Sequence, residues 1–307
     1  MLGVLVSRPA SVASCAAQEK PCDGTWLGFV QREAAEWCTL PAITRVAAMA
    51  DAEERKLAEK ATYNRQANLH RPAYGSYWDR ELYDRMFAGE YDADLKRLAQ
   101  QFLPGKRVLI LGAGISEVRL VREYTPRIDA LNISEKAVTD LQQAFPEVHA
   151  FVADAESFRA SDVYDVVYCH SVLHHLQPFE QVAENLASCL APGGVLLVAA
   201  EPGLYNPFAA LARRFAPSQS HTPGERPFHF SAYSRTLAKH FEPVFENHYF
   251  LAAMLLPFAA RKVALLKPVF GAAISPLLTV ERWLRSLPGA RNLYWITCGV
   301  YRRRASA

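Results

Sequence analysis

One short run, from Val108 to Leu120 (VLILGAGISEVRL), restricts what this chain can fold into more than any other part of it. Its apolar start is typical of a strand buried on both faces of a parallel sheet, and a helix-like segment follows at once. Gly112 and Gly114 allow a sharp turn and leave room for a ligand, because neither carries a Cβ atom. A GxG turn alone is a weak signal, since dehydrogenases and turns that bind nothing also have it. With its strand and helix, the run predicts a place where the backbone approaches a nucleoside.

Four further strand-like runs follow at the spacing of an α/β fold, and helical patterns separate them. Between residues 182 and 190, for example, the apolar residues fall on one helical face. Alternating strands and helices predict a doubly wound parallel sheet that binds ligands at the carboxyl edge of its strands. The four runs are IDALNIS (128–134), VHAFVADAE (148–156), YDVVYCHSVLHHL (164–176) and LAPGGVLLVAAEPG (190–203).

Four of these motifs, in this order, resemble those of the class I S-adenosylmethionine-dependent methyltransferases. LGAG is similar to the glycine motif of that family, ADAE to its adenine-contacting acidic motif, YDVVYCHSVLHHL to its fourth-strand motif, and LAPGGVLLVAAEP to the loop and strand after it. The resemblance covers residues 105–203, about a third of the chain. It implies an α/β fold with a doubly wound, seven-stranded, mostly parallel sheet whose last strand is antiparallel. It also implies S-adenosyl-L-methionine as the cofactor and S-adenosyl-L-homocysteine as the product.

The resemblance also implies a cofactor site. Asn132 would bond the ribose, since it lies twenty residues after Gly112, and Asp154 would bond the adenine amino group. Two positions depart from the family pattern: Ser116 stands in place of a third glycine, and Asn132 in place of an acidic residue. An amide can donate and accept, but it lacks the charge that strengthens such bonds. The predicted cofactor-binding residues are Gly112, Ala113, Gly114, Asn132, Ile133, Asp154, Ala155, Glu156 and His170.

A dehydrogenase that binds NAD is the alternative for the same turn. Its fingerprint is GxGxxG, whereas Glu117 stands three residues after Gly114. A carboxylate at the start of the helix would repel a pyrophosphate, while a sulfonium cofactor has no phosphate to repel. Glu117 therefore favours the methyltransferase interpretation.

Two histidines are the candidates for catalysis. His170 lies at the carboxyl end of the fourth strand, where an imidazole could take a proton from the acceptor or line the cofactor pocket. His174 lies four residues later and could assist or bind substrate, although a structural role for it and for His175 remains open. The spacing of four between His170 and His174 could suggest a metal, but no third ligand is evident nearby. We expect no metal.

The chain is predicted to have three zones: an N-terminal helical extension and cap (1–95), the cofactor-binding core (96–205), and a substrate loop, helical cap and final strands (206–307). Helices are expected from about 51, 76 and 92, and the aromatic residues Tyr63 and Trp78 could line a pocket. A proline- and aromatic-rich stretch after the fifth strand has the composition of a binding loop, in which Glu225 could also meet the substrate. The predicted substrate-binding residues are Tyr74, Tyr77, His221 and Arg226.

The apolar, proline-interrupted insertion at 250–287 precedes the last strand and has three interpretations. It could close an apolar pocket, form a dimer face, or present a basic amphipathic surface to lipid headgroups. Lysines, prolines and a glycine interrupt it, so we expect no membrane span.

Composition limits the remaining choices. The 34 basic and 31 acidic residues argue against a nucleic-acid surface, and six cysteines without a CxxC pair favour a reducing, cytoplasmic setting. We therefore expect a cytoplasmic methyltransferase acting on a small, partly apolar molecule, with oxygen or nitrogen favoured over carbon as the acceptor. A subunit that binds the cofactor without transferring a methyl group, and an enzyme that methylates a lipid at a membrane surface, are the alternatives. A small-molecule substrate is the expected partner, and a homodimer and contact with a membrane surface stay open.

Overall fold

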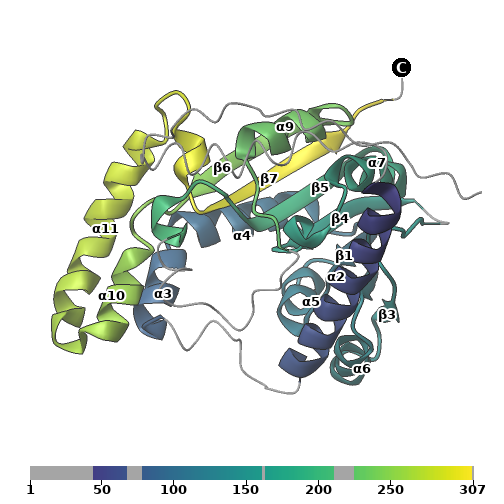
Figure 1. Cartoon of the computed structure of the whole chain (residues 1–307), viewed down its shortest axis with the longest axis horizontal. Helices are drawn as coiled ribbons and strands as arrows, with labels where there is room; N and C mark the ends of the chain where they lie inside the picture. The colour runs from purple at the N-terminus through teal and green to yellow at the C-terminus, as the bar shows by residue number, and fades with distance from the viewer. Residues whose placement is uncertain (1–43, 68–77, 161–162, 211–224, 306–307) are drawn as a thin grey trace, which may run out of the picture. The chain divides into compact units, whose positions relative to one another are not determined.

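The computed structural model describes residues 44–67, 78–160, 163–210 and 225–305. The chain divides into two units, residues 1–52 and 53–307, and the fold below is that of the second. A seven-stranded sheet runs through it in the order β3-β2-β1-β4-β5-β7-β6 (Figure 1). Its strands are β1 (Val108–Leu111), β2 (Ile128–Asn132), β3 (His149–Val152), β4 (Tyr164–His170), β5 (Leu190–Pro202), β6 (Phe241–Tyr249) and β7 (Ile296–Arg303).

The pairing of the strands confirms the predicted fold class. The first five strands are parallel to one another, and β7 runs antiparallel to both β5 and β6. All four residues of β1 are buried, as expected of a strand covered on both faces. The last strand begins at Ile296, after a short 3₁₀ turn (Ala290–Leu293).

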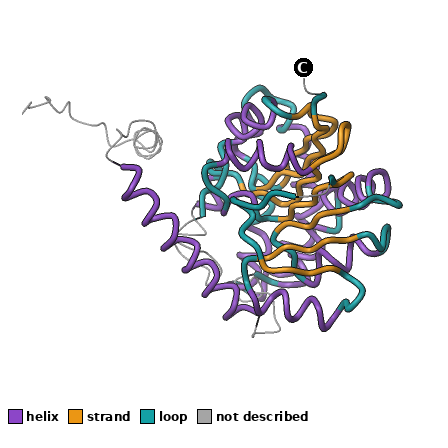
Figure 2. Tube along the Cα trace, turned by 90° about the vertical axis from the view of Figure 1, so that its right-hand side faces the viewer, coloured by secondary structure: helices purple, strands orange, loops and turns teal. Residues whose placement is uncertain are grey.

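Helices cover both faces of the sheet, and the alternating side chains of β1 show which helices pack on each face. Val108 and Ile110 pack with α4 (Glu90–Phe102), α5 (Ile115–Arg122) and α6 (Glu135–Ala144). Leu109 and Leu111 point the other way and pack with α7 (Phe179–Cys189) and α9 (Phe230–Ala238). Successive side chains of a strand point to opposite faces, so one apolar run serves both layers. Figure 2 shows the strands between the two sets of helices.

Four more helices belong to the N-terminal segment and to the insertion between β6 and β7. Their bounds are α2 (Thr44–Ala67), α3 (Arg80–Phe87), α10 (Leu255–Lys262) and α11 (Lys267–Leu284). Asp79 caps α3 by accepting a hydrogen bond from the backbone N–H of Leu82. In the sequence the insertion lies between β6 and β7, and in Figure 1 α10 and α11 lie beside α3.

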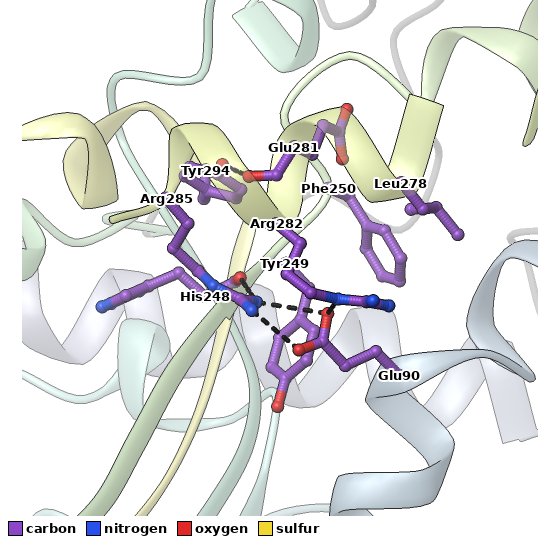
Figure 3. A pocket seen from close by; sticks show the side chains of 9 residues that line it. All are labelled: Glu90, His248, Tyr249, Phe250, Leu278, Glu281, Arg282, Arg285 and Tyr294. Atoms are coloured by element: carbon purple, nitrogen blue, oxygen red, sulfur yellow. Dashed lines mark hydrogen bonds and ion pairs between the residues drawn. The ribbon is translucent and has the colours of Figure 1, made fainter. Parts of the chain in front are cut away.

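A polar anchor fixes the C-terminal part of α11 to the core. Arg285 forms an ion pair with Glu90 of α4 at 2.7 Å and donates a hydrogen bond to the carbonyl oxygen of His248 at 2.8 Å (Figure 3). Burial acts to raise the pKa of Glu90, but Arg285 and Arg282 outweigh it and hold this pKa below its ordinary value. The small cavity that these side chains line has a volume of about 10 Å³, too little for more than a water molecule. The anchor therefore sets which side of α11 faces outward.

Candidate functional site

A cavity of about 910 Å³ opens at the carboxyl edge of the parallel strands. It is lined by residues at or after the ends of β1, β2, β3 and β4 and by α2. Aromatic side chains from α3, from α10 and from the residues just before α3 and β7 complete the lining. A cavity of this size holds a nucleoside cofactor and a small acceptor together. Of the predicted cofactor-binding residues, those that line it are Gly112, Asn132, Ile133, Asp154, Ala155, Glu156 and His170.

The turn after β1 depends on a residue without a side chain. Gly112 has a φ of +63°, in the left-handed region that favours glycine. A Cβ atom there would lie 2.6 Å from Cγ2 of Val172. Gly112 is thus required both by its backbone conformation and by the close approach of Val172.

Glu117 has a local task that the sequence analysis did not assign to it. Its Oε2 accepts a hydrogen bond from the N–H of Gly114 at 3.0 Å, which satisfies a backbone group at the start of α5. Its Oε1 lies 3.6 Å from Nδ1 of His170.

Gly114 and Ala113 were predicted to contact the cofactor, but they are not among the described residues that line the cavity, and Ala113 is fully buried.

Asn132 holds the glycine turn in place. Its amide group donates to the carbonyl oxygen of Ala113 at 2.9 Å, and its oxygen accepts from the N–H of Ser134 at 2.9 Å. An amide at this position can make both bonds, whereas a carboxylate could only accept. The second amide hydrogen and the second lone pair still allow a bond to a ribose, which stays a prediction.

Basic residues of α2 pair with the acidic motif after β3. Lys56 lies 2.7 Å from Asp154 and 3.0 Å from Glu156, and Arg55 lies 2.6 Å from Glu156. Burial acts to lower the pKa of Lys56, but its bonds to the two carboxylates outweigh this and raise the pKa. Asp154 also accepts a hydrogen bond from the N–H of Glu156. Because Lys56, Glu59 and Tyr63 line the cavity, α2 forms its wall beside Asp154, where adenine is expected.

His174 is paired with a carboxylate that the sequence analysis did not single out. Its Nδ1 lies 2.9 Å from Oε2 of Glu201, and both side chains are buried. An ionised carboxylate only accepts, so Nδ1 carries the hydrogen and Nε2 is left as an acceptor. Burial acts to raise the pKa of Glu201, but His174 and the N–H groups of Val172 and Leu173 outweigh it and keep this pKa below its ordinary value. Burial also lowers the pKa of His174, so its neutral form is favoured.

His175 lies in a second polar group, on the α2 side of the cavity. Its Nδ1 is 3.4 Å from Oε1 of Glu59, and its Nε2 is 3.2 Å from the hydroxyl of Tyr63. His174, His175 and Glu225 each place one donor atom within 4.8 Å of the other two. The structure thus brings Glu225 to the two histidines as a third potential ligand, which the sequence pattern did not show.

The far part of the cavity is aromatic. Trp78 stacks on Trp295 with ring centroids 5.7 Å apart and meets Phe258 edge-on at 6.1 Å. Tyr83 and Phe87 stack beside them at 4.6 Å, and all five rings line the cavity. These rings offer a large apolar contact surface to a ligand. We call Trp78, Tyr83, Phe87, Phe258 and Trp295 the aromatic arm.

None of the four predicted substrate-binding residues appears in the described lining of the cavity. Tyr74, Tyr77 and His221 lie outside the described residues. Arg226 is exposed and does not appear in the described lining of the cavity, although its neighbour Glu225 does.

The sequence did not predict that Glu201 is a partner of His174. A carboxylate at the end of the apolar run VLLVAAE was a usable signal, because an acid in a buried strand needs a partner.

Comparison with known proteins agrees with this geometry. A family model described as a methyltransferase domain matches residues 109–196. Trans-aconitate 2-methyltransferase of Acidovorax sp. (strain JS42) is 28% identical over 147 residues, which are 47% of this chain and 57% of that protein. The protein of the same name from Variovorax paradoxus (strain S110) is 26% identical over 149 residues, which are 45% of this chain and 56% of that protein. The chain thus spans little more than half the length of these curated relatives.

A solved structure supports the fold independently. A chain of the complex between the Haloferax volcanii Trm112 methyltransferase activator and a methyltransferase superposes with a TM-score of 0.52 at 15% identity, covering 80% of this chain and 98% of that one. At this identity the likeness concerns the fold alone. The family match identifies residues 109–196 as a methyltransferase domain, and with the strand order it supports a class I S-adenosylmethionine-dependent methyltransferase, whose cofactor is S-adenosyl-L-methionine.

Proposed function

We propose that this protein transfers a methyl group from S-adenosyl-L-methionine to a small, partly apolar molecule through an oxygen or nitrogen atom. The observation that carries this proposal is that one cavity joins the carboxyl edge of β1, β2 and β3 to the aromatic arm. A cofactor held near Gly112, Asn132 and Asp154 and an acceptor held by the aromatic arm would share one enclosed space. Enclosure aligns the two reactants and excludes water.

The cofactor, when bound, supplies a methyl group already activated by its sulfonium. The remaining task is to orient the acceptor and to take its proton. We propose His174 as the base, because Glu201 orients its ring and leaves Nε2 as the acceptor. His170 is the second candidate, since it lines the cavity at the end of β4 near Glu117.

The charge of the cavity narrows the class of acceptor. The described lining carries seven carboxylates and two basic side chains, so it favours a neutral or cationic ligand over an anionic one. The sulfonium of the cofactor fits this balance. The relatives are named for trans-aconitate, which is a tricarboxylate, and we propose that the acceptor here differs in charge from theirs. The residues counted are Glu59, Asp84, Asp92, Glu117, Asp154, Glu156 and Glu225, with Lys56 and Arg80.

A labelling experiment tests the function. The purified chain is incubated with methyl-labelled cofactor and with a metabolite extract separated into cationic, neutral and anionic fractions. We expect label in a product from the cationic or neutral fraction, with a mass increased by one CH2 unit. Transfer confined to the anionic fraction would contradict the proposed acceptor class. Tight binding of S-adenosyl-L-homocysteine without transfer in any fraction would favour a binding subunit.

A second candidate function is methylation of a lipid at a membrane surface. One observation favours it: the insertion presents an exposed apolar face, and its α10 lines the cavity through Phe258.

The cytoplasmic setting is also part of our proposal, and the buried free thiols of Cys169, Cys189 and Cys298 are compatible with it.

A further inference from the structure

The outward side of α11 is apolar along its whole length. Leu265, just before the helix, is 89% exposed, Val269 is 63% exposed and Trp283 is 67% exposed. Val280 and Leu287 are also exposed, and steps of three and four residues through Ala272 and Pro276 connect the set. Residues at this spacing share one helical face. We call Leu265, Val269, Ala272, Pro276, Val280, Trp283 and Leu287 the α11 stripe.

The α11 stripe lies in the insertion for which the sequence left a lipid-facing surface open. The stretch Ala264–Leu284 is long and apolar enough to cross one, and only 17% of its most apolar window is buried. A helix of the protein core with this composition would be mostly buried. Most monomeric proteins do not leave so continuous an apolar face exposed without a partner.

The opposite side of α11 is occupied, so the stripe cannot simply rotate inward. Gly271 lies against Leu82 of α3, and Ile274 is buried. Glu281 is buried and accepts hydrogen bonds from the N–H groups of Ala252 and Ala253 at 2.5 and 2.6 Å. With the anchor of Arg285 shown in Figure 3, these contacts keep the stripe outward.

The charges around the stripe indicate which partner covers it. Of the basic side chains between residues 261 and 287, Lys267 pairs with Asp79 and Glu81, and Arg282 and Arg285 pair with Glu90. The two that remain, Arg261 and Lys262, are exposed at the end of α10, next to Leu265. A second copy of the chain would bring the same positive charges to the contact and be repelled. An anionic lipid surface would attract them and accept the apolar side chains.

The geometry favours a helix that lies along the membrane rather than one that crosses it. At 1.5 Å per residue, the 18 residues of α11 span about 27 Å, but the buried Glu281 and the paired Arg285 lie on its other side. A spanning helix would have to expose these polar groups to hydrocarbon. A helix with one apolar face and one polar, anchored face suits the interface.

We propose that the α11 stripe docks the protein on an anionic lipid bilayer, with α11 parallel to the surface. Met254, just before α10, and Phe258 of α10 line the same cavity as the aromatic arm. Docking therefore brings the cavity close to the bilayer, from which an amphiphilic acceptor could be drawn. This last point rests on the proposed methyl transfer, whereas docking itself does not.

A flotation assay with lipid vesicles tests the proposal without cofactor or acceptor. The full chain is mixed with vesicles of phosphatidylcholine, with or without phosphatidylglycerol. We expect flotation with the anionic vesicles, weaker flotation with the neutral ones, and a loss of binding in high salt. The double variant Leu265→Glu/Val269→Glu should bind at least about tenfold more weakly. Leu57→Glu is the matched control, because Leu57 is 65% exposed on another helix, α2, and it should bind as the parent chain does.

Two further measurements separate the outcomes. Brominated lipids should quench the fluorescence of the parent chain, and less so that of the Trp283→Phe variant. Light scattering after gel filtration gives the oligomeric state without lipid. No flotation of the parent chain, equal loss in the Leu57→Glu control, or a dimer that the double variant dissociates would overturn the proposal. Thermal melting of each variant checks that it folds, and failure of docking would leave the labelling test for methyl transfer unaffected.

Discussion

Nδ1 of His174 donates a hydrogen bond to Oε2 of Glu201 at 2.9 Å, and neither side chain is exposed to solvent by more than a few per cent. Glu201 also accepts hydrogen bonds from the backbone N–H groups of Val172, Leu173 and His174, so the turn that follows β4 holds the carboxylate in place. The same bonds fix the turn and the tautomer of the histidine. A single acid at the end of β5 therefore links the fold to the proposed chemistry.

We expect the His174→Gln variant to lose about 10²–10⁴-fold in kcat, because general-base catalysis contributes about that much. Its affinity for S-adenosyl-L-homocysteine should stay within twofold of that of the parent chain, as measured by calorimetry. His170→Gln is the comparison variant. A larger loss of kcat in His170→Gln than in His174→Gln would transfer the role of base to His170.

The dependence on pH follows from the direction of the His174 pKa. Burial lowers this pKa from its ordinary value of 6.5, so the folded protein resists protonation that the unfolded chain accepts. Stabilisation by neutral His174 is present above pH 6.5 and is lost as the pH falls through the lower pKa of the folded state. We expect kcat and the free energy of unfolding to fall together over this acidic range. A His174→Gln variant whose free energy of unfolding keeps the full slope there would contradict this cause.

A pair of glycine variants separates backbone strain from steric overlap. Gly112→Ala and Gly193→Ala both place alanine in the left-handed region, with φ of +63° and +75°, at a cost of about 1–2 kcal/mol. Only the first also meets Val172, whereas the second meets nothing within 4 Å. We expect Gly112→Ala to cost about 1–3 kcal/mol more in the free energy of unfolding. Adding Val172→Ala should recover part of that difference, and no recovery would rule out the overlap.

Removal of the Asp154 carboxylate tests the adenine site. We expect Asp154→Ala to weaken binding of S-adenosyl-L-homocysteine by about 1–3 kcal/mol, measured by calorimetry, if the buried bond to adenine forms. Asp140→Ala is the control, since Asp140 pairs with Lys136 on α6, away from the cavity lining. An unchanged affinity in Asp154→Ala would count against the assignment and leave Asp154 as a partner of Lys56 and of the Glu156 N–H.

Chelation tests the expectation that the enzyme needs no metal. His174, His175 and Glu225 lie close enough to bind a divalent ion, but Glu201 already orients His174, and His175 lies within reach of Glu59 and Tyr63. We expect dialysis against EDTA to leave methyl transfer unchanged, and metal analysis of the purified chain to find less than one ion per molecule. Activity that disappears on chelation and returns with Zn²⁺ or Mn²⁺ would assign the cluster as a metal site.

Local sequence predicted the fold because each strand carries its own signal. The run after Arg107 is apolar at every position, so it had to be buried on both faces, and Gly112 then marks the turn. The acidic motif and the histidines at the ends of β3 and β4 were placed at the same edge by the parallel order alone. Most of the predicted cofactor residues line one cavity for that reason.

Contacts between distant segments could not be predicted in the same way. Glu201 meets His174 across 27 residues, and Lys56 meets Asp154 across 98, and nothing in either local pattern names its partner. Asn132 was predicted as a ribose ligand from its position, while its use as a brace for Ala113 depends on how the turn folds back. Apolar periodicity shows that an insertion is helical, but not which of its faces meets the protein.

The sequence alone determined the order of strands and helices, the glycine turn and the set of polar residues at the sheet edge, because burial and turn chemistry act over a few residues. Only the tertiary structure decided that His174 is paired with Glu201, that α2 closes the acidic motif, and that the α11 stripe faces outward. Those features arise where residues far apart in the chain meet, and their pairing depends on packing that no short segment encodes.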